Sequence, residues 1–220
     1  MKKIFFVVAA SSIFLACNNS ISADKATTSD KQAAATAEGT AYTVDTTSAI
    51  TWTGTKPGGS HTGIFSVKDG SISFKDSVIT GGNFTINILS LNNSDLKGES
   101  KGKLEGHLKS ADFFDAEKFP TAKFEITGIE PFKYDSLTNK NVVLKNATHT
   151  IKGNFTLKDS TKNISFPAIV AVSGDKVTAT ADFNIDRTLW GLNYKGPNNP
   201  QDWAISKQVN IKLNIAAAKK

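Results

Sequence analysis

From Ala41 onward, apolar and polar residues alternate one by one along several separate stretches of the chain. The clearest stretch runs from Val177 to Ile185, where every second residue is apolar and the residues between them are Thr, Asp or Asn. The same pattern recurs at residues 50–55, 71–75, 84–89, 122–127 and 209–215. Because successive side chains of a strand point to opposite faces, this period predicts strands with one buried and one wet face.

Glycine-containing pairs interrupt the alternation and predict turns at Asp69-Gly70, Gly81-Gly82 and Gly174-Asp175. About eight strands with few helical signals between them predict an antiparallel sandwich or barrel. Polar outer faces combined with many inward aromatic residues favour closure, because a closed barrel has no exposed edge strands. We therefore expect an all-β domain at residues 40–220, a single antiparallel β-barrel of about eight strands.

One segment, residues 95–119, lacks the period of two. Leu104 and Leu108 are four residues apart and His107 is three residues from Leu104, which is helical spacing. Phe113 and Phe114 follow, and Pro120 ends the segment. We expect a short helical segment that caps one end of the barrel, either as a plug or as a lid over a ligand mouth.

The first residues are typical of an export signal. Residues 1–16 combine Lys2 and Lys3 with a short apolar run, which predicts a signal peptide. The residues Phe14-Leu15-Ala16-Cys17 resemble a bacterial lipobox, so Cys17, the only cysteine, is expected to carry the lipid of a membrane anchor. Ordinary secretion with cleavage elsewhere is the alternative. We expect a lipid-anchored protein of the cell envelope that faces the periplasm.

Residues 17–39 are expected to form the lipidated N-terminus and a flexible tether. The stretch is rich in Asn, Ser, Ala and Thr and has almost no large apolar residue, so it cannot offset the entropy cost of ordering. As a coil, it would hold the barrel about 25 Å from its anchor.

Charge and motifs exclude several function classes. The net charge is +6, but Arg187 is the only arginine and no basic run with interleaved aromatics exists, so nucleic acid is not expected as a partner. His61, His107 and His149 are widely spaced, with no cysteine beside them, so we expect no metal site. No motif of a known catalytic constellation is present, so we expect no enzyme and no catalytic residue.

Three segments together resemble the YceI-like family. They are residues 106–124, residues 149–157 with Lys162 and Phe166-Pro167, and residues 181–188 with Trp190-Gly191. The resemblance covers about Ala41 to the C-terminus. It implies a lipocalin-like antiparallel barrel with a long apolar tunnel that binds an isoprenoid lipid, such as a quinone or a polyprenyl phosphate. No cofactor is implied apart from such a bound lipid.

Candidate ligand-binding residues come from four parts of the chain. Alternation places five phenylalanines inside the barrel, where each either lines a tunnel or packs a filled core: Phe65, Phe84, Phe124, Phe155 and Phe183. The helical segment adds Leu104, Leu108, Phe113 and Phe114 at the mouth. His61, in a glycine-rich stretch, is a candidate for a head group. Arg187 with Trp190 forms either a structural ion pair or stack, or a phosphate site.

The sequence therefore favours a membrane-tethered envelope protein that carries or sequesters an isoprenoid-type lipid in its barrel. The main alternative is a ligand-free envelope protein for stress response or adhesion, which would act through its outer surface and have a packed interior. A barrel enzyme acting on an isoprenoid would instead need polar groups converging inside, such as His61 with a carboxylate. Self-association into a homodimer is left open.

Overall fold

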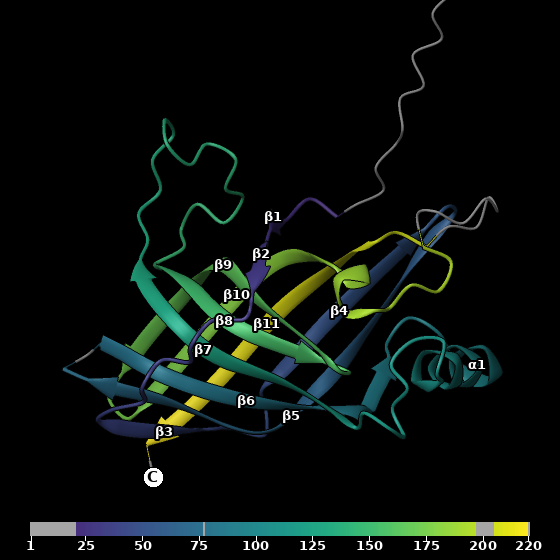
Figure 1. Ribbon diagram of the computed structural model, residues 1–220, viewed down its shortest axis with the longest axis horizontal. Coiled ribbons are helices and arrows are strands. Elements are labelled where there is room, and N and C mark those ends of the chain that lie inside the picture. The colour runs from purple at the N-terminus through teal and green to yellow at the C-terminus, as the bar shows by residue number, and fades with distance from the viewer. Residues whose placement is uncertain (1–20, 77, 197–204, 220) are drawn as a thin grey trace, which may run out of the picture.

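Eight antiparallel strands close into a barrel in the computed structural model, which describes residues 21–76, 78–196 and 205–219 (Figure 1). The wall strands are β4 (Ala49–Lys56), β5 (Gly59–Lys75), β6 (Val78–Asn93), β7 (Thr121–Pro131), β8 (His149–Leu157), β9 (Ser160–Ser173), β10 (Lys176–Asp186) and β11 (Gln208–Lys219). The remaining elements are β1 (Asp24–Lys25), β2 (Thr27–Asp30), β3 (Thr40–Val44), α1 (Gly98–Lys109) and the short 3-10 helix η1 (Arg187–Trp190).

Closure depends on two strand pairings between elements that lie far apart in the sequence. Strand β11 pairs with β4 and, further along, with β3, and both β3 and β4 also pair with β5. Strands β3 and β4 therefore both lie between β11 and β5, end to end, and together occupy one strand position in the wall. On the other side, β10 pairs with both β11 and β9, which completes the ring. The expected closed barrel is confirmed.

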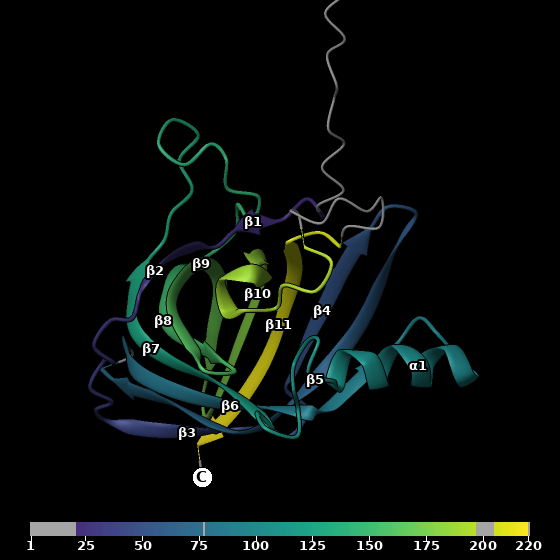
Figure 2. The same ribbon diagram turned by 45° about the vertical axis from the view of Figure 1, so that its right-hand side comes forward.

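The alternation assigns the faces as expected, and the apolar face forms the interior. One cluster of buried residues fills the end of the barrel that lies away from α1: Tyr42, Val67, Ile72, Phe74, Val177, Ile215 and Ala217. A larger cluster, which includes Trp52, Phe166 and Phe183, surrounds the middle and the α1 end. The helical cap is also confirmed, as α1 stands at one end of the barrel (Figure 2).

Two of the three expected turns are wrong. Strand β5 continues through Asp69-Gly70 and β6 continues through Gly81-Gly82, whereas Gly174 does form the β9–β10 turn. Gly70 lies beside a register shift, where a Cβ would meet the Asn83 carbonyl oxygen at 2.8 Å. At Gly81 a Cβ would lie 3.1 Å from the backbone of Ala37. These glycines permit close backbone approach within strands, which is the other common role of glycine.

Residues 21–38, here called the N-terminal strap, lie against the barrel, in contrast to the tether expected over 17–39. Pairing between β9 and β10 extends only as far as Ile169 and Thr180. Beyond that point β1 pairs with β10 and β2 pairs with β9. The strap therefore occupies the seam where the two wall strands separate.

Buried asparagines explain why so polar a segment is ordered. Asn154 points out of the wall but is only 1% exposed, because it exchanges two hydrogen bonds with the backbone of Gln32, at 3.0 and 2.8 Å. Asn184 similarly donates to the carbonyl oxygen of Ile21 at 2.7 Å. Asp24 accepts hydrogen bonds from the backbone amides of Val143 and Leu144, at 2.7 and 2.9 Å. Polar pairing of this kind, together with the strand pairing of β1 and β2 and the burial of Ala26, fixes the strap. The signal peptide and Cys17 lie outside the described residues.

Candidate ligand-binding cavity

The barrel encloses a cavity of about 460 Å³, within the range of typical ligand pockets of about 300–1,000 Å³. It extends from the interior faces of all eight wall strands to α1 and the segment that follows η1. Aliphatic and aromatic side chains form almost the whole lining, and polar residues such as Lys56, His61, His107 and Lys195 belong to the elements at one end. The interior can therefore hold an apolar chain with a polar group at the mouth.

Eleven of the twelve residues expected to bind ligand line this cavity: His61, Phe65, Phe84, Leu104, Leu108, Phe113, Phe114, Phe124, Phe155, Phe183 and Arg187. The structure therefore brings together residues from five strands, α1, the segment after α1 and η1. Trp190 is the exception. It is completely buried, its indole N–H donates to the carbonyl oxygen of Phe155 at 2.9 Å, and it packs edge-on against the Phe155 ring. It supports a lining residue from behind.

The guanidinium of Arg187 binds main-chain carbonyl groups and does not form a phosphate site. It is 4% exposed, and its guanidinium donates to the carbonyl oxygens of Ser206, Ile205, Tyr194 and Leu192. Burial lowers the pKa of Arg187, and Asp186 beside it raises that pKa by a smaller amount. Because its donors are directed at main-chain carbonyls, Arg187 fixes the segment that follows η1 at the cavity rim.

The mouth contains an aromatic group that sequence reasoning did not bring together. The His107 ring contacts the rings of Phe113 and Tyr194 edge-on, with centroids 5.2 and 4.7 Å apart. His107 Nε2 also lies 3.0 Å from a carboxylate oxygen of Asp112. Tyr194 was missed because it lies in an irregular segment without any period, and only folding places it against α1.

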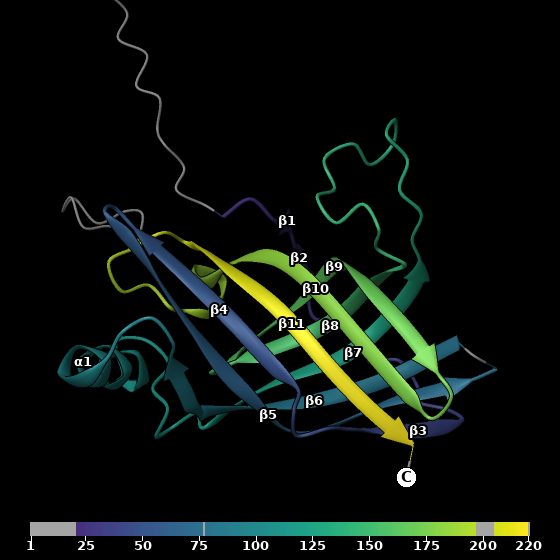
Figure 3. The same cartoon turned by 180° about the vertical axis from the view of Figure 1, so that it is seen from behind.

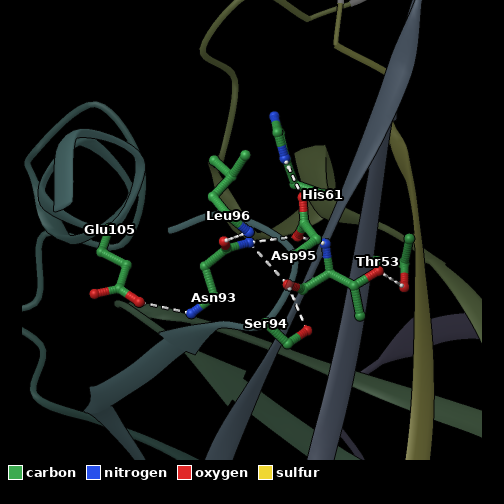
Figure 4. Close-up of polar contacts among 8 residues, drawn as sticks. Thr53, His61, Asn93, Ser94, Asp95, Leu96 and Glu105 are labelled. Carbon is green, nitrogen blue, oxygen red and sulfur yellow. Dashed lines mark hydrogen bonds and ion pairs between the residues drawn. The ribbon is translucent and has the colours of Figure 1, made fainter. Parts of the chain in front are cut away.

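A second polar group ties α1 to the wall beside the mouth (Figure 4). Asn93, at the end of β6, is completely buried. Its backbone amide donates to Glu105 of α1 at 2.7 Å, and its side-chain amide donates to Asp95 at 2.6 Å. Asp95 also accepts from the Thr62 amide at 2.7 Å and lies 2.8 Å from His61 Nδ1.

The Asp95 carboxylate determines which ring nitrogen of His61 carries a proton. Burial raises the pKa of Asp95, but hydrogen bonds from His61, the Thr62 amide and Asn93 outweigh this effect and hold the pKa below its ordinary value. An ionised carboxylate only accepts hydrogen bonds, so His61 Nδ1 carries the proton. In neutral His61, Nε2 is then an acceptor at the edge of the cavity.

We expect Asp95→Ala to lower the free energy of unfolding by about 1–2 kcal/mol at pH 7, because the buried Asn93 amide loses an acceptor. A carboxylate whose native pKa is lowered stabilises the fold above its unfolded pKa of about 3.9. That contribution is lost as the pH falls through the native value. Urea unfolding of both proteins as a function of pH measures the difference, which should shrink below about pH 4.

The matched control is Asp69→Ala, which removes an exposed carboxylate from β5, the strand that carries the Asp95 partners His61 and Thr62. It should change stability by less than about 0.5 kcal/mol. Equal losses in the two variants would contradict the structural role of Asp95.

Among the described residues, no group of three or more His, Cys, Asp or Glu side chains is arranged to hold a metal ion. His149 lies apart from the two mouth histidines, in β8, with Nδ1 2.9 Å from the hydroxyl of Thr148. No helix in the described part of the chain is long and apolar enough to cross a membrane.

A closed antiparallel barrel with an apolar cavity is the architecture of the lipocalin-like proteins, whose interiors are wide enough for one small ligand. Residues 21–217 match the YceI-like domain, and the chain therefore belongs to the YceI-like family. The match begins at the strap, about 20 residues before the segment in which the sequence resemblance was recognised.

Solved structures share this fold. BcnA of Burkholderia cenocepacia superposes with a TM-score of 0.60 at 20% identity, covering 80% of this chain and 99% of BcnA. A polyisoprenoid binding domain from Saccharophagus degradans, implicated in plant cell wall breakdown, gives 0.59 at 15% identity, covering 82% and 99%. The YceI protein of Campylobacter jejuni gives 0.50 at 20% identity, covering 70% and 83%. No curated protein is significantly similar in sequence.

Proposed function

We propose that this chain is a membrane-tethered protein of the bacterial envelope, which binds one isoprenoid-type lipid inside its barrel and acts as a carrier or sequestering module. The cavity is the observation that carries the proposal. Burial of apolar surface contributes about 25 cal/mol per Å², so a prenyl chain gains affinity along the whole lining without specific hydrogen bonds. The name of the Saccharophagus degradans relative, a polyisoprenoid binding domain, is consistent with such a ligand.

The membrane anchor is proposed from the signal peptide predicted at residues 1–16 and from the position of Cys17 after an apolar run. An acylated Cys17 would anchor the protein in a membrane, with the barrel in the periplasm.

The polar mouth suggests where the head group lies. Nδ1 of His61 and Nε2 of His107 face carboxylates, so the opposite nitrogen of each ring can accept a hydrogen bond when the ring is neutral. A hydroxyl head group, as in a quinol, could donate to either ring. The His61–Asp95 pair is the convergence that an isoprenoid-modifying enzyme would need. However, Asp95 is also fixed by Thr62 and Asn93, which supports a positioning role rather than catalysis.

The proposal is tested on the full chain, because the strap at residues 21–38 pairs with the wall strands β9 and β10. The protein is produced with export in a bacterial host, extracted in mild detergent and measured by native mass spectrometry, after which the bound lipid is identified by organic extraction. We expect a stoichiometric prenyl lipid.

A ligand-free mass, together with no uptake of added quinone or polyprenyl phosphate, would contradict the proposal. The ligand-free, surface-acting alternative would then stand, although it predicts a packed interior and the barrel encloses a cavity of about 460 Å³. A second mass reading on the intact chain detects acyl groups on Cys17 and tests the anchor separately.

A further inference from the structure

The connection between β7 and β8, residues 132–148, exposes an unusual combination of side chains. Leu137 is 87% exposed and Val143 is 51% exposed, so both are large apolar residues in contact with water. Three lysines of the same connection are also exposed: Lys133, Lys140 and Lys145. Exposed apolar residues among cations are the chemistry that adsorbs to an anionic lipid surface, where the apolar groups enter the interface and the lysines meet the head groups.

Its single acidic residue does not cancel this charge. Asp135 accepts hydrogen bonds from the Leu137 amide at 2.8 Å and from the Thr138 hydroxyl at 3.1 Å, so it organises the turn that presents Leu137. The connection carries a net charge of +2, with three lysines against this one aspartate and no glutamate. Lys145 lies over the Tyr134 ring at 5.3 Å.

The connection is fixed to the N-terminal strap. Asp24 of β1 is 5% exposed and accepts from the amides of Val143 and Leu144, while β1 pairs with β10 of the wall. The exposed Val143 therefore has a defined position beside the start of the described chain at Ile21. Cys17 lies four positions before Ile21, which limits the distance between them to about 14 Å.

The views show that these parts lie on one side of the molecule. Figures 1, 2 and 3 are related by turns about the vertical axis, so height is the same in all three. In each, the connection 132–148, β1 and the β4–β5 end lie at the top, whereas the β9–β10 turn and the C-terminal strand end lie at the bottom (Figure 3). Lys56, at the end of β4, is exposed and borders the cavity.

We propose that the surface formed by residues 132–148 and the start of the strap, here called the docking face, rests on an anionic lipid bilayer. This inference rests on the proposed anchoring of Cys17 and adds an orientation to it. The proposed anchor at Cys17 lies four positions before the start of the strap, which is beside the docking face. The strap in turn pairs with the wall strands β9 and β10. The barrel is thus held on the membrane with the β4–β5 rim of the cavity turned toward it. A ligand then passes between bilayer and cavity without crossing the periplasm.

The test uses the full lipidated chain in vesicles of phosphatidylcholine and phosphatidylglycerol. Single cysteines carry a fluorophore in Ser136→Cys, on the docking face, or in Ser173→Cys, at the β9–β10 turn; both serines are exposed. Spin-labelled lipids quench a probe that lies at the bilayer surface. We expect several-fold stronger quenching at position 136 than at position 173. The parent chain, with Cys17 alone, reports whether that thiol is blocked by acylation.

Charge reversal supplies the second arm. Each lysine near an anionic surface contributes about fivefold to adsorption, so Lys133→Glu, Lys140→Glu and Lys145→Glu together should abolish the preferential quenching at position 136. The matched control reverses three exposed lysines elsewhere on the barrel, Lys68, Lys123 and Lys219, and should preserve it.

Equal quenching at the two positions, stronger quenching at 173, or the same loss in both triple variants would overturn the docking face. Lipid content by native mass spectrometry in detergent is measured on the same variants. A protein that retains its lipid but shows no preferential quenching refutes this inference alone, whereas absence of bound lipid in the parent chain refutes the proposed function.

Discussion

Replacing Ala168 by tryptophan should abolish lipid binding while leaving the barrel folded. Ala168 lies on β9, is 2% exposed and lines the cavity. An indole ring at this position would occupy space that the ligand needs and displace it from about 100 Å² of apolar wall. At about 25 cal/mol per Å² this loss is about 2.5 kcal/mol, or roughly 60-fold in affinity. Steric exclusion of the remaining part of the lipid would reduce the affinity further.

The cost in stability should be small, because the ring enters a cavity rather than a filled core. Ala171→Trp is the matched control, since Ala171 lies three residues further along the same strand and is exposed. Native mass spectrometry should show the parent lipid in Ala171→Trp and little or none in Ala168→Trp, with similar urea midpoints. Full lipid occupancy in a folded Ala168→Trp protein would mean that the ligand lies elsewhere.

Arg187→Met should be the most destabilising single change at the rim, at about 3–4 kcal/mol. The substitution keeps apolar bulk but removes the donors that meet the main-chain carbonyls of Leu192, Tyr194, Ile205 and Ser206. For a chain of this size, this corresponds to a fall in Tm of about 6–16 °C. Calorimetry of the lipid-free protein measures it. Hydrogen exchange should show the largest increase in residues 191–196.

Two further substitutions separate geometry from charge. Arg187→Lys retains the cation but cannot reach several carbonyls at once, so most of the loss should remain. Lys207→Met removes a cation from the same rim, where it is exposed and 3.5 Å from Asp186, and should cost less than about 1 kcal/mol. If Lys207→Met were as damaging as Arg187→Met, charge at the rim would matter more than the carbonyl contacts.

Much of the cavity could be read from the sequence because alternation reports a local property of the backbone. Phe84, Phe124, Phe155 and Phe183 face inward simply because each holds the apolar phase of its strand. The helical spacing of Leu104 and Leu108 identified the cap in the same way. Whether these residues surround space or pack against one another depends on the barrel's diameter and register, which are properties of the whole sheet.

Glycine pairs were less informative, because glycine serves both turns and close contacts. Gly174 has a positive φ of 57° and makes a turn, whereas Gly70 and Gly81 sit within strands because neighbouring backbone approaches them. That neighbouring backbone comes from β6 and from the strap, and only folding brings it close.

The sequence by itself determined an all-β chain with inward aromatic residues and a helical cap, since each follows from local periodicity. Only the tertiary structure decided the roles of Arg187, Trp190 and the strap. Arg187 needed carbonyl partners up to 19 residues away. The strap is too polar to predict its own order and is fixed by Asn154 and Asn184, more than 100 residues distant. Pairing between such distant polar groups leaves no periodic trace, because it depends on the closed barrel bringing them together.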